Sequence, residues 1–256
     1  MARIHLFEFE DLPWFPSFLR NYGTDFLQFL ANKTKMYEPV IPLLQKGLQN
    51  SCTAQIVDLA SGGSGGLLWL NQELKKTYPL LKILLTDYFP NTDAFDYTKK
   101  QAENIDYLAE PVDARDVPEK LKGLRTQFLS LHHFTPSDAQ RILQNAVDAQ
   151  QPIAIFEAQE RSFRSILAMF FSPITVLLTT PMIRPFKLGR ILYTYLIPIV
   201  PLFVWWDGMV SCLRTYSVKE MQHLVNQLNK KDSFAWDIGK MKSGPGVILY
   251  LLGTKK

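Results

Sequence analysis

Residues 56–66 read IVDLASGGSGG and decide the fold. An apolar run ends at the acid Asp58, a turn rich in glycine (Gly62, Gly63, Gly65) follows, and a helical pattern comes next. Glycine permits positive φ angles and a close approach of the backbone to a ligand. Amide groups at the start of a helix can bind a polar or anionic group. We therefore interpret this stretch as a strand, a ligand-binding turn and the start of a helix.

The same alternation of strand and helix continues along the chain. Strand-like runs cover 54–60, 82–87, 107–113, 126–134 and 152–158, and helical patterns separate them, including a short one at 117–123. Strands that alternate with helices predict an open, mostly parallel sheet with helices on both faces. The sequence therefore predicts an α/β fold.

The end of the chain has a different pattern. Two strand-like runs, 233–242 and 246–255, are joined by the SGPG turn with no room for a helix between them. Such a short connection requires an antiparallel hairpin. We expect the parallel sheet to be closed by this hairpin.

Two further segments stand apart from the alternating pattern. Helical patterns at 14–30 and 36–49 precede the first strand, and 160–216 is strongly apolar, with no charge in 165–183 or 191–206. Prolines and the short second stretch argue against membrane-spanning helices, which need about 20 apolar residues. We predict an N-terminal helical lid (1–50), a core (51–159 and 217–256) and an apolar helical cap (160–216), together forming one structural domain.

The glycine-rich turn does not fit two common nucleotide motifs. A Walker loop requires a lysine before its Ser or Thr, but Leu67 and Leu68 follow the glycines. A GxGxxG fingerprint starting at Gly63 lacks its last glycine. A dinucleotide site is therefore the weaker interpretation.

The motifs resemble those of the class I S-adenosylmethionine-dependent methyltransferases. DLASGGSGG (58–66) is similar to the glycine-rich first motif, TDYF (86–89) to the second-strand acid, and VDARDV (112–117) to the third motif. The resemblance covers about residues 50–256 apart from the apolar segment. Ala60 departs from the pattern, because the family often has glycine there. The resemblance implies a Rossmann-like sheet and S-adenosylmethionine (SAM) as cofactor.

The resemblance also implies the residues that hold the cofactor. Gly62, Ser64 and Gly65 would lie beside its methionine part, Asp87 would bind the ribose, and the remaining positions would surround the loop, the adenine and the sulfonium. The full predicted set is Asp58, Ala60, Ser61, Gly62, Ser64, Gly65, Asp87, Tyr88, Asp113, Ala114 and Leu131. For Asp113, a cap of a helix before Val117 is an alternative.

Two histidines follow the fourth strand, where chemistry is expected. His133 is a candidate general base and His132 a candidate wall of the cofactor site, because imidazole titrates near neutral pH. Glu157 could orient a histidine; a helix cap or a salt bridge with Arg161 is the alternative. Both histidines could also be structural hydrogen-bonding groups. The sequence LHHF replaces the Asn-Pro-Pro turn of relatives that methylate nucleobases or glutamine, which argues against those acceptors.

The apolar cap suggests the acceptor. We expect Trp14, Phe15, Trp206, Asp207, Arg214 and Tyr216 to contact it, with Asp207 and Arg214 forming an ion pair. The predicted function is O-methylation of a small hydrophobic, lipid-like or anionic acceptor. A catalytically silent protein of the same fold, binding a ligand, a partner or a membrane surface, is the alternative. The apolar residues could equally form a buried helical hairpin.

Composition and charge support this interpretation. With 47% hydrophobic residues and a net charge of +4, the chain can bury a core and lacks the dense positive charge of nucleic-acid binders. Residues 161–214 hold six basic residues and one acid, a net +5, so the rest of the chain carries −1. Two isolated cysteines indicate neither disulfides nor a metal site. The N-terminus has no signal-peptide pattern, and we expect a cytoplasmic protein with peripheral membrane contact possible through 165–206.

Overall fold

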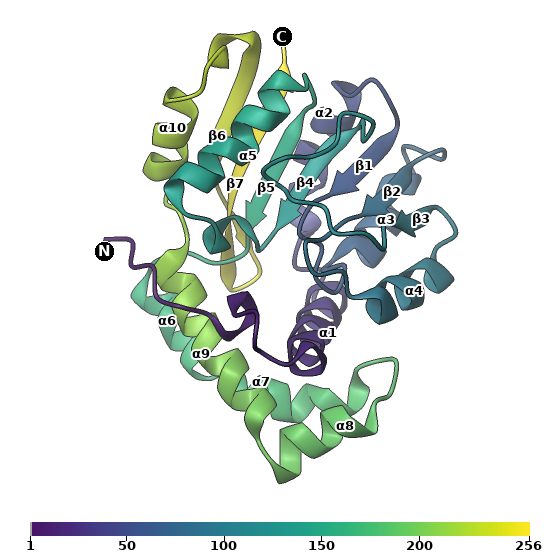
Figure 1. Ribbon diagram of the computed structural model, residues 1–256, viewed down its shortest axis with the longest axis vertical. Helices are drawn as coiled ribbons and strands as arrows, with labels where there is room; N and C mark the ends of the chain where they lie inside the picture. The colour runs from purple at the N-terminus through teal and green to yellow at the C-terminus, as the bar shows by residue number, and fades with distance from the viewer. Residues whose placement is uncertain (1) are drawn as a thin grey trace.

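A seven-stranded sheet forms the centre of the computed structural model, which describes residues 2–256 (Figure 1). Met1, the first residue of the predicted lid, lies outside the described residues. The strands are β1 (Gln55–Asp58), β2 (Lys82–Leu85), β3 (Ile105–Tyr107), β4 (Leu124–Phe128), β5 (Ile153–Glu157), β6 (Phe234–Ser243) and β7 (Gly246–Lys255). Their order is β3-β2-β1-β4-β5-β7-β6. The first five are parallel, and β7 runs antiparallel to β5 and β6, which confirms the predicted fold class and hairpin.

Helices cover both faces of this sheet. The helices α2 (Ile41–Gln49), α3 (Leu67–Lys75) and α4 (Thr92–Gln101) supply one hydrophobic core, and α5 (Pro136–Asp148) and α10 (Val218–Asn226) supply the other. In α5 the buried residues Ala139, Ile142, Leu143 and Ala146 follow helical spacing. Each face of the sheet is therefore buried, as parallel strands require.

Two predicted elements differ in the structure. The strand expected at 107–113 lies earlier, at Ile105–Tyr107, and no helix forms at 117–123. A strand over 107–113 is disfavoured by Pro111, which has no amide proton to donate to a neighbouring strand. Only four residues separate Pro118 from Gly123, whose φ is +144°. So short a segment offers barely one helical turn, and a single turn does not compensate the entropy of starting a helix.

The helical pattern at 14–30, which allows one or two short helices with a weak point at Gly23, forms a single helix. A short 3₁₀ turn (Phe9–Asp11) precedes α1 (Ser17–Lys33), and another (Glu38–Val40) precedes α2. Gly23 sits within α1, and a Cβ atom there would come within 2.9 Å of the Phe203 ring. The glycine therefore allows close packing between α1 and the cap rather than ending the helix.

The cap forms the lower lobe of the molecule (Figure 1). It contains α6 (Phe163–Phe170), α7 (Ser172–Thr179), a 3₁₀ turn (Thr180–Met182), α8 (Leu188–Ile191), a π-turn (Leu192–Leu196) and α9 (Ile199–Arg214). Phe15, Phe26, Val176 and Phe203 share one hydrophobic cluster, so the lid and cap pack together. Asp25 of α1 is 1% exposed and lies 2.7 Å from the guanidinium of the buried Arg190.

No single helix among residues 2–256 is long and apolar enough to cross a bilayer. Two bent pairs, Phe163–Phe170 with Ser172–Met182 and Leu188–Leu196 with Ile199–Arg214, reach that length and composition together, with bends of 42° and 79°.

Candidate functional site

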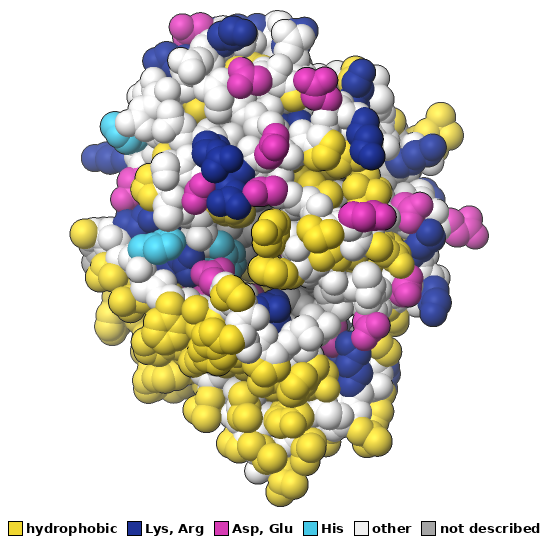
Figure 2. Space-filling view, in the orientation of Figure 1, with side chains coloured by type: hydrophobic (Ala, Val, Ile, Leu, Met, Phe, Trp, Pro, Cys, Tyr) yellow, Lys and Arg dark blue, Asp and Glu magenta, His cyan; other side chains and the backbone are white. Residues whose placement is uncertain are grey.

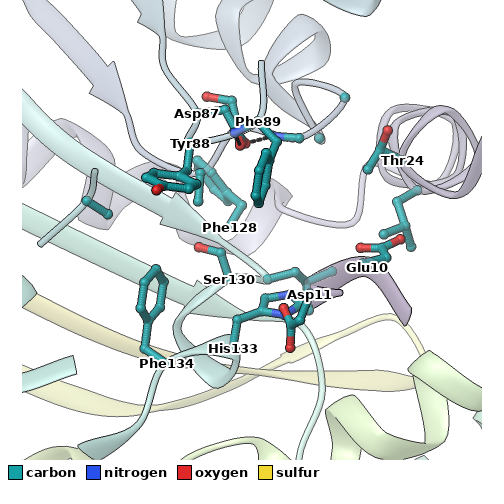
Figure 3. Close-up of a pocket in the computed structure, with 18 of the residues that line it drawn as sticks. Glu10, Asp11, Thr24, Asp87, Tyr88, Phe89, Phe128, Ser130, His133 and Phe134 are labelled. Carbon is teal, nitrogen blue, oxygen red and sulfur yellow. Dashed lines mark hydrogen bonds and ion pairs between the residues drawn. The ribbon is translucent and has the colours of Figure 1, made fainter. Parts of the chain in front are cut away.

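A cavity of about 450 Å³ opens at the carboxyl ends of β1, β2 and β4 (Figure 3). The turn after β1 supplies Gly62 and Gly65, the segment after β2 supplies Asp87, and the segment after β4 supplies Ser130. In open α/β sheets, ligands bind at this edge. Its volume lies within the range of about 300–1,000 Å³ for small-molecule sites. This first cavity is therefore where a cofactor would bind.

The turn after β1 has several left-handed residues. Gly62 and Gly65 have φ angles of +53° and +44°, and Ala60 and Ser64 also have positive φ, at +53° and +69°. A non-glycine residue in this region costs about 1–2 kcal/mol. Ala60, where the resembled family often has glycine, therefore occupies a position at which glycine would carry no such cost.

Asp87 holds the glycine-rich turn in place. Its Oδ2 accepts a hydrogen bond from the Gly62 amide at 2.7 Å, and its Oδ1 accepts one from the Phe89 amide at 2.8 Å. Burial raises the pKa of Asp87, and these two amides oppose that effect by stabilising the charged form. The carboxylate lines the first cavity, so its remaining lone pairs can accept hydrogen bonds from a ligand diol.

Helix α1 closes over the same turn. Gln28 donates a hydrogen bond to the Ser64 hydroxyl at 2.7 Å, and Asn32 donates one to the Gly65 carbonyl at 2.7 Å. A Cβ atom on Gly63 would lie 2.6 Å from the Thr24 carbonyl oxygen. The lid is therefore built against the turn, and Gly63 has no side chain because α1 occupies that space.

A second cavity of about 190 Å³ adjoins the first beneath the cap. Most of its wall is apolar and comes from α1, α6, α7 and α9, including Phe26, Met169 and Val204. Leu129 and His133 line both cavities. The two cavities therefore share part of their wall.

His132 and Glu157 form a buried pair at this second cavity. The Glu157 carboxylate accepts a hydrogen bond from the His132 amide at 3.2 Å and lies 2.7 Å from Nδ1 of the ring. A carboxylate accepts hydrogen bonds, so Nδ1 donates its proton to Glu157, and Nε2 is the ring nitrogen that can take a proton. Nε2 lies 3.9 Å from Glu8. The geometry suits a base oriented by an acid.

His133 has a different environment. Its Nδ1 lies 2.8 Å from Asp11 and 3.3 Å from Glu8 (Figure 3 shows the contact with Asp11). Burial alone would lower the pKa of His133, but the charges of Glu8 and Asp11 outweigh burial and raise it to about 10. His133 is therefore protonated at neutral pH, which favours an ion-pairing role over the predicted role of base.

The predicted ion pair between Asp207 and Arg214 does not form. Arg214 instead lies 2.5 Å from Asp11 and 3.2 Å from Glu8, and Asp207 accepts hydrogen bonds from the Phe9 and Glu10 amides. Asp207 and Arg214 lie seven positions apart on α9, a rise of about 10 Å, and nearer partners in the N-terminal segment occupy both side chains. Both side chains instead fix the N-terminal segment.

Two acids in this region have pKa values well above those of ordinary carboxyl groups. Burial raises the pKa of Glu10 to about 8, and the charge of Asp207 adds to the shift. Burial also raises the pKa of Asp207 to about 7. The wall of the second cavity thus carries less negative charge than its residue types suggest.

Donor atoms of Glu8, His132 and His133 lie within 4.8 Å of one another, a spacing that could hold a metal ion. Arg214 contacts Glu8 on one side, and protonated His133 contacts it on the other. These cations neutralise the carboxylates that a metal would need. We interpret the cluster as an ion-pair network, and the sequence-based expectation of no metal stays a prediction.

The structure brings most of the predicted site residues together. Ala60, Ser61, Gly62, Gly65, Asp87, Tyr88, Asp113, Ala114, His133 and Arg214 line the first cavity, and His132, His133 and Asp207 line the second. Asp113 caps no helix; it forms a salt bridge of 2.7 Å with Arg115. Glu157 does not form the alternative salt bridge with Arg161, because Arg161 pairs with Glu220.

Several predicted residues do not reach either cavity. Asp58 bonds to Thr126, Ser64 bonds to the lid, and Leu131 packs in the core, while Leu129 and Ser130 line the cavity in its place. The residues 131–133 form a 3₁₀ turn, which directs successive side chains to different sides. Among the expected acceptor contacts, Trp14 is exposed, Phe15 and Tyr216 are buried in the core, and Trp206 donates to the Phe7 carbonyl.

The sequence interpretation missed the N-terminal acids. Glu8, Glu10 and Asp11 line the cavities. The available signal was the alternation of acids with phenylalanines in FEFED, residues 7–11. Thr24 and Gln159 are further lining residues that no motif marked.

Comparison with solved structures identifies the fold. The plantazolicin methyltransferase BpumL, solved with S-adenosylhomocysteine (SAH), is 13% identical, with a TM-score of 0.54 over 94% of this chain and 88% of its own. A protein from Rhodobacter sphaeroides, provisionally named a Zn-dependent alcohol dehydrogenase, is 8% identical, with a TM-score of 0.55 over 93% and 98%. PigF with SAH is 18% identical, with a TM-score of 0.50 over 96% and 63%.

These likenesses establish the fold and nothing finer, because every identity is low. Neither a family model nor a curated protein matches the sequence. The structural likenesses, the strand order and the closing hairpin together show that the chain has the class I SAM-dependent methyltransferase fold.

Proposed function

We propose that the protein is a SAM-dependent methyltransferase that methylates an oxygen atom of a small hydrophobic or lipid-like acceptor. The observation that carries this proposal is the pair of adjoining cavities. One is lined by the glycine-rich turn and Asp87, and the other is apolar and contains His132. BpumL and PigF, both solved with SAH, support the choice of cofactor.

The residues of the first cavity fit this cofactor. Asp87 presents a carboxylate beside the turn, which suits a ribose diol, and Asp113 with Ala114 lies further along the same wall. Gly65 would tolerate a close ligand, because nothing lies within 4 Å of where its Cβ would be. When bound, the cofactor supplies a methyl group on a positively charged sulfur, and this carbon needs no further activation.

The residues of the second cavity would prepare the acceptor. His132 Nε2 can take the proton of an acceptor hydroxyl, and Glu157 then stabilises the imidazolium through Nδ1. The C–O bond forms as the bond from carbon to sulfur breaks, and the electron pair of that bond stays on sulfur. The apolar walls from α6, α7 and α9 exclude water and select a greasy acceptor. A carboxylate acceptor would need no base.

Two measurements test the proposal. Isothermal titration calorimetry should detect SAH binding, and incubation with methyl-labelled SAM should transfer label to 4-nonylphenol or palmitic acid. His132→Ala should leave SAH affinity unchanged and reduce transfer to the phenol far more than transfer to the acid. Absence of SAH binding would contradict the proposal. Binding without transfer to either acceptor would favour the catalytically silent protein.

A further inference from the structure

We propose that the outer face of the cap, residues 163–202, docks on an anionic lipid bilayer and inserts apolar side chains shallowly. Fifteen of the 24 large hydrophobic side chains that are exposed in residues 2–256 fall in this segment. The six most exposed of them, at 56–77%, are Phe163, Leu178, Phe186, Leu188, Leu196 and Leu202. Figure 2 shows hydrophobic side chains over most of the lower lobe.

The cap helices are apolar on both sides. Met169, Thr175 and Val204 face the second cavity from α6, α7 and α9. On the same helices Phe170 and Leu178 are exposed at 52% and 69%. A helix on the surface of a water-soluble protein normally turns a polar face outward. The outer face of this cap therefore fits an apolar environment better than water, and a patch of this kind marks an interaction surface.

The charge of the segment selects the kind of surface. Residues 163–206 contain four basic residues and no acid. Lys187 and Arg190 pair with Asp25 of the lid, whereas Arg164 and Arg184 are exposed and enter no ion pair within residues 2–256. Exposed charges on this face are therefore positive only. They complement anionic phospholipid headgroups, which attract basic residues next to a membrane.

The same charges argue against a second copy of the chain. In a two-fold symmetric dimer the same face meets itself, so Arg164 and Arg184 would face a surface that carries other basic residues and no acid. Like charges across an interface oppose association. A bilayer with anionic lipids satisfies both the apolar side chains and the two cations.

The helix lengths indicate shallow insertion. Helices α6 and α7 have eight residues each, and the 16-residue α9 directs Asp207 and Arg214 into the protein. Such helices suit the plane of the headgroup region, where apolar side chains reach the acyl boundary. Tyr195, 46% exposed, is the kind of residue found at that boundary.

The docking surface and the second cavity share three helices. α6, α7 and α9 supply exposed apolar residues on one side and cavity walls on the other. A protein docked in this way would place the second cavity next to the acyl layer. If the proposed methyl transfer holds, this placement brings a lipid-like acceptor to the site; the docking surface itself does not depend on it.

Vesicle flotation of the whole chain tests the surface. The parent protein should float with phosphatidylcholine vesicles that contain phosphatidylglycerol and much less with phosphatidylcholine alone. Leu188→Glu with Leu196→Glu should reduce partition roughly tenfold or more. Leu80→Glu is the matched control, because Leu80 is 84% exposed but lies outside the cap. Arg164→Gln with Arg184→Gln should remove the preference for anionic vesicles.

Two further readouts separate the outcomes. Circular dichroism and SAH calorimetry on each variant show that the fold and the first cavity are intact, so failure of lipid binding is distinct from failure of the proposed function. A parent protein that stays monomeric and unbound with anionic vesicles would overturn the proposal. So would a dimer in solution that dissociates when Leu188 and Leu196 are replaced by Glu.

Discussion

The carboxylate of Glu157 lies 2.7 Å from Nδ1 of His132, and neither side chain has more than 3% of its surface exposed. The two residues come from different segments of the chain, the end of β5 and the turn after β4, which the parallel sheet places side by side. This contact fixes which ring nitrogen carries the proton. It leaves Nε2 as the free nitrogen at the second cavity.

Replacing Glu157 by Gln should therefore disable the base without harming the cofactor site. The glutamine amide can donate to Nδ1, which places the ring proton on Nε2 and removes the charge that stabilises the imidazolium. We expect kcat for a hydroxyl acceptor to fall by roughly 10²-fold, within the usual range for general bases. Steady-state kinetics measures the loss, and an SAH affinity within twofold of the parent is the control. Unchanged turnover would remove His132 from the mechanism.

Asp87 should be the most sensitive residue of the first cavity. Asp87→Asn keeps the shape but replaces one acceptor oxygen with a donor that opposes the Gly62 and Phe89 amides. We expect SAH affinity to fall by roughly tenfold or more, as loss of hydrogen bonds to a charged group implies. Asp93→Asn, an exposed acid in α4, is the matched control. Equal affinities of the two variants would contradict the assignment of the cofactor site.

The left-handed residues give a third prediction. Gly65→Ala should cost about 1–2 kcal/mol from backbone strain alone, because a Cβ there meets no atom within 4 Å. Ala60→Gly relieves strain but adds freedom to the unfolded chain, so its net effect should be below about 1 kcal/mol. Urea unfolding measures both changes. Gly244→Ala, at φ +52° in the β6–β7 turn, should cost as much as Gly65→Ala but leave SAH affinity unchanged.

Stability should fall as pH rises from 5 to 9, because His133, Glu10, Asp207 and Asp58 all have pKa values raised by the fold. His133 has a folded pKa of about 10 against an ordinary 6.5, so the stability it provides is complete below pH 6.5 and lost toward pH 10. Burial raises the pKa values of Glu10, Asp207 and Asp58 to about 8, 7 and 7, so ionising these acids destabilises the folded state and lowers stability over a lower pH range, in the same direction. The lowered pKa of Asp11 acts oppositely, but only at acidic pH.

Urea unfolding at a series of pH values measures this slope. His133→Gln and Glu10→Gln should each flatten it, because the variant side chains do not titrate. His223→Gln, which removes an exposed histidine from α10, should leave the slope unchanged. A parent slope that is flat between pH 5 and 9 would show that the N-terminal segment does not hold these groups as the structure places them.

Sequence patterns captured the features that depend on neighbouring residues. The apolar runs of the strands, the glycines of 62–65 and the acid at the end of β2 are local signals, and apart from the third strand each is found where it was predicted. The absent helix at 117–123 is a local failure: its pattern was helical, but its length was too short for a helix.

The rest of the site depends on contacts between distant residues. Asp11 meets Arg214 across 203 positions, and Phe9 meets Asp207 across 198. No spacing rule links such residues, so the sequence suggested the nearer partner and paired Asp207 with Arg214. Which of the two adjacent histidines contacts Glu157 likewise depends on the 3₁₀ turn, and the sequence did not reveal the form of that turn.

Helix α1 connects the glycine-rich turn and the cap by buried polar bonds at successive turns. Gln28 bonds to Ser64, and three residues earlier Asp25 pairs with Arg190. Opening the lid alone would leave the buried Arg190 without its carboxylate, which is strongly unfavourable. Helix α1, the glycine-rich turn and the cap should thus unfold in a single cooperative transition, and the cap should not persist as a folded intermediate.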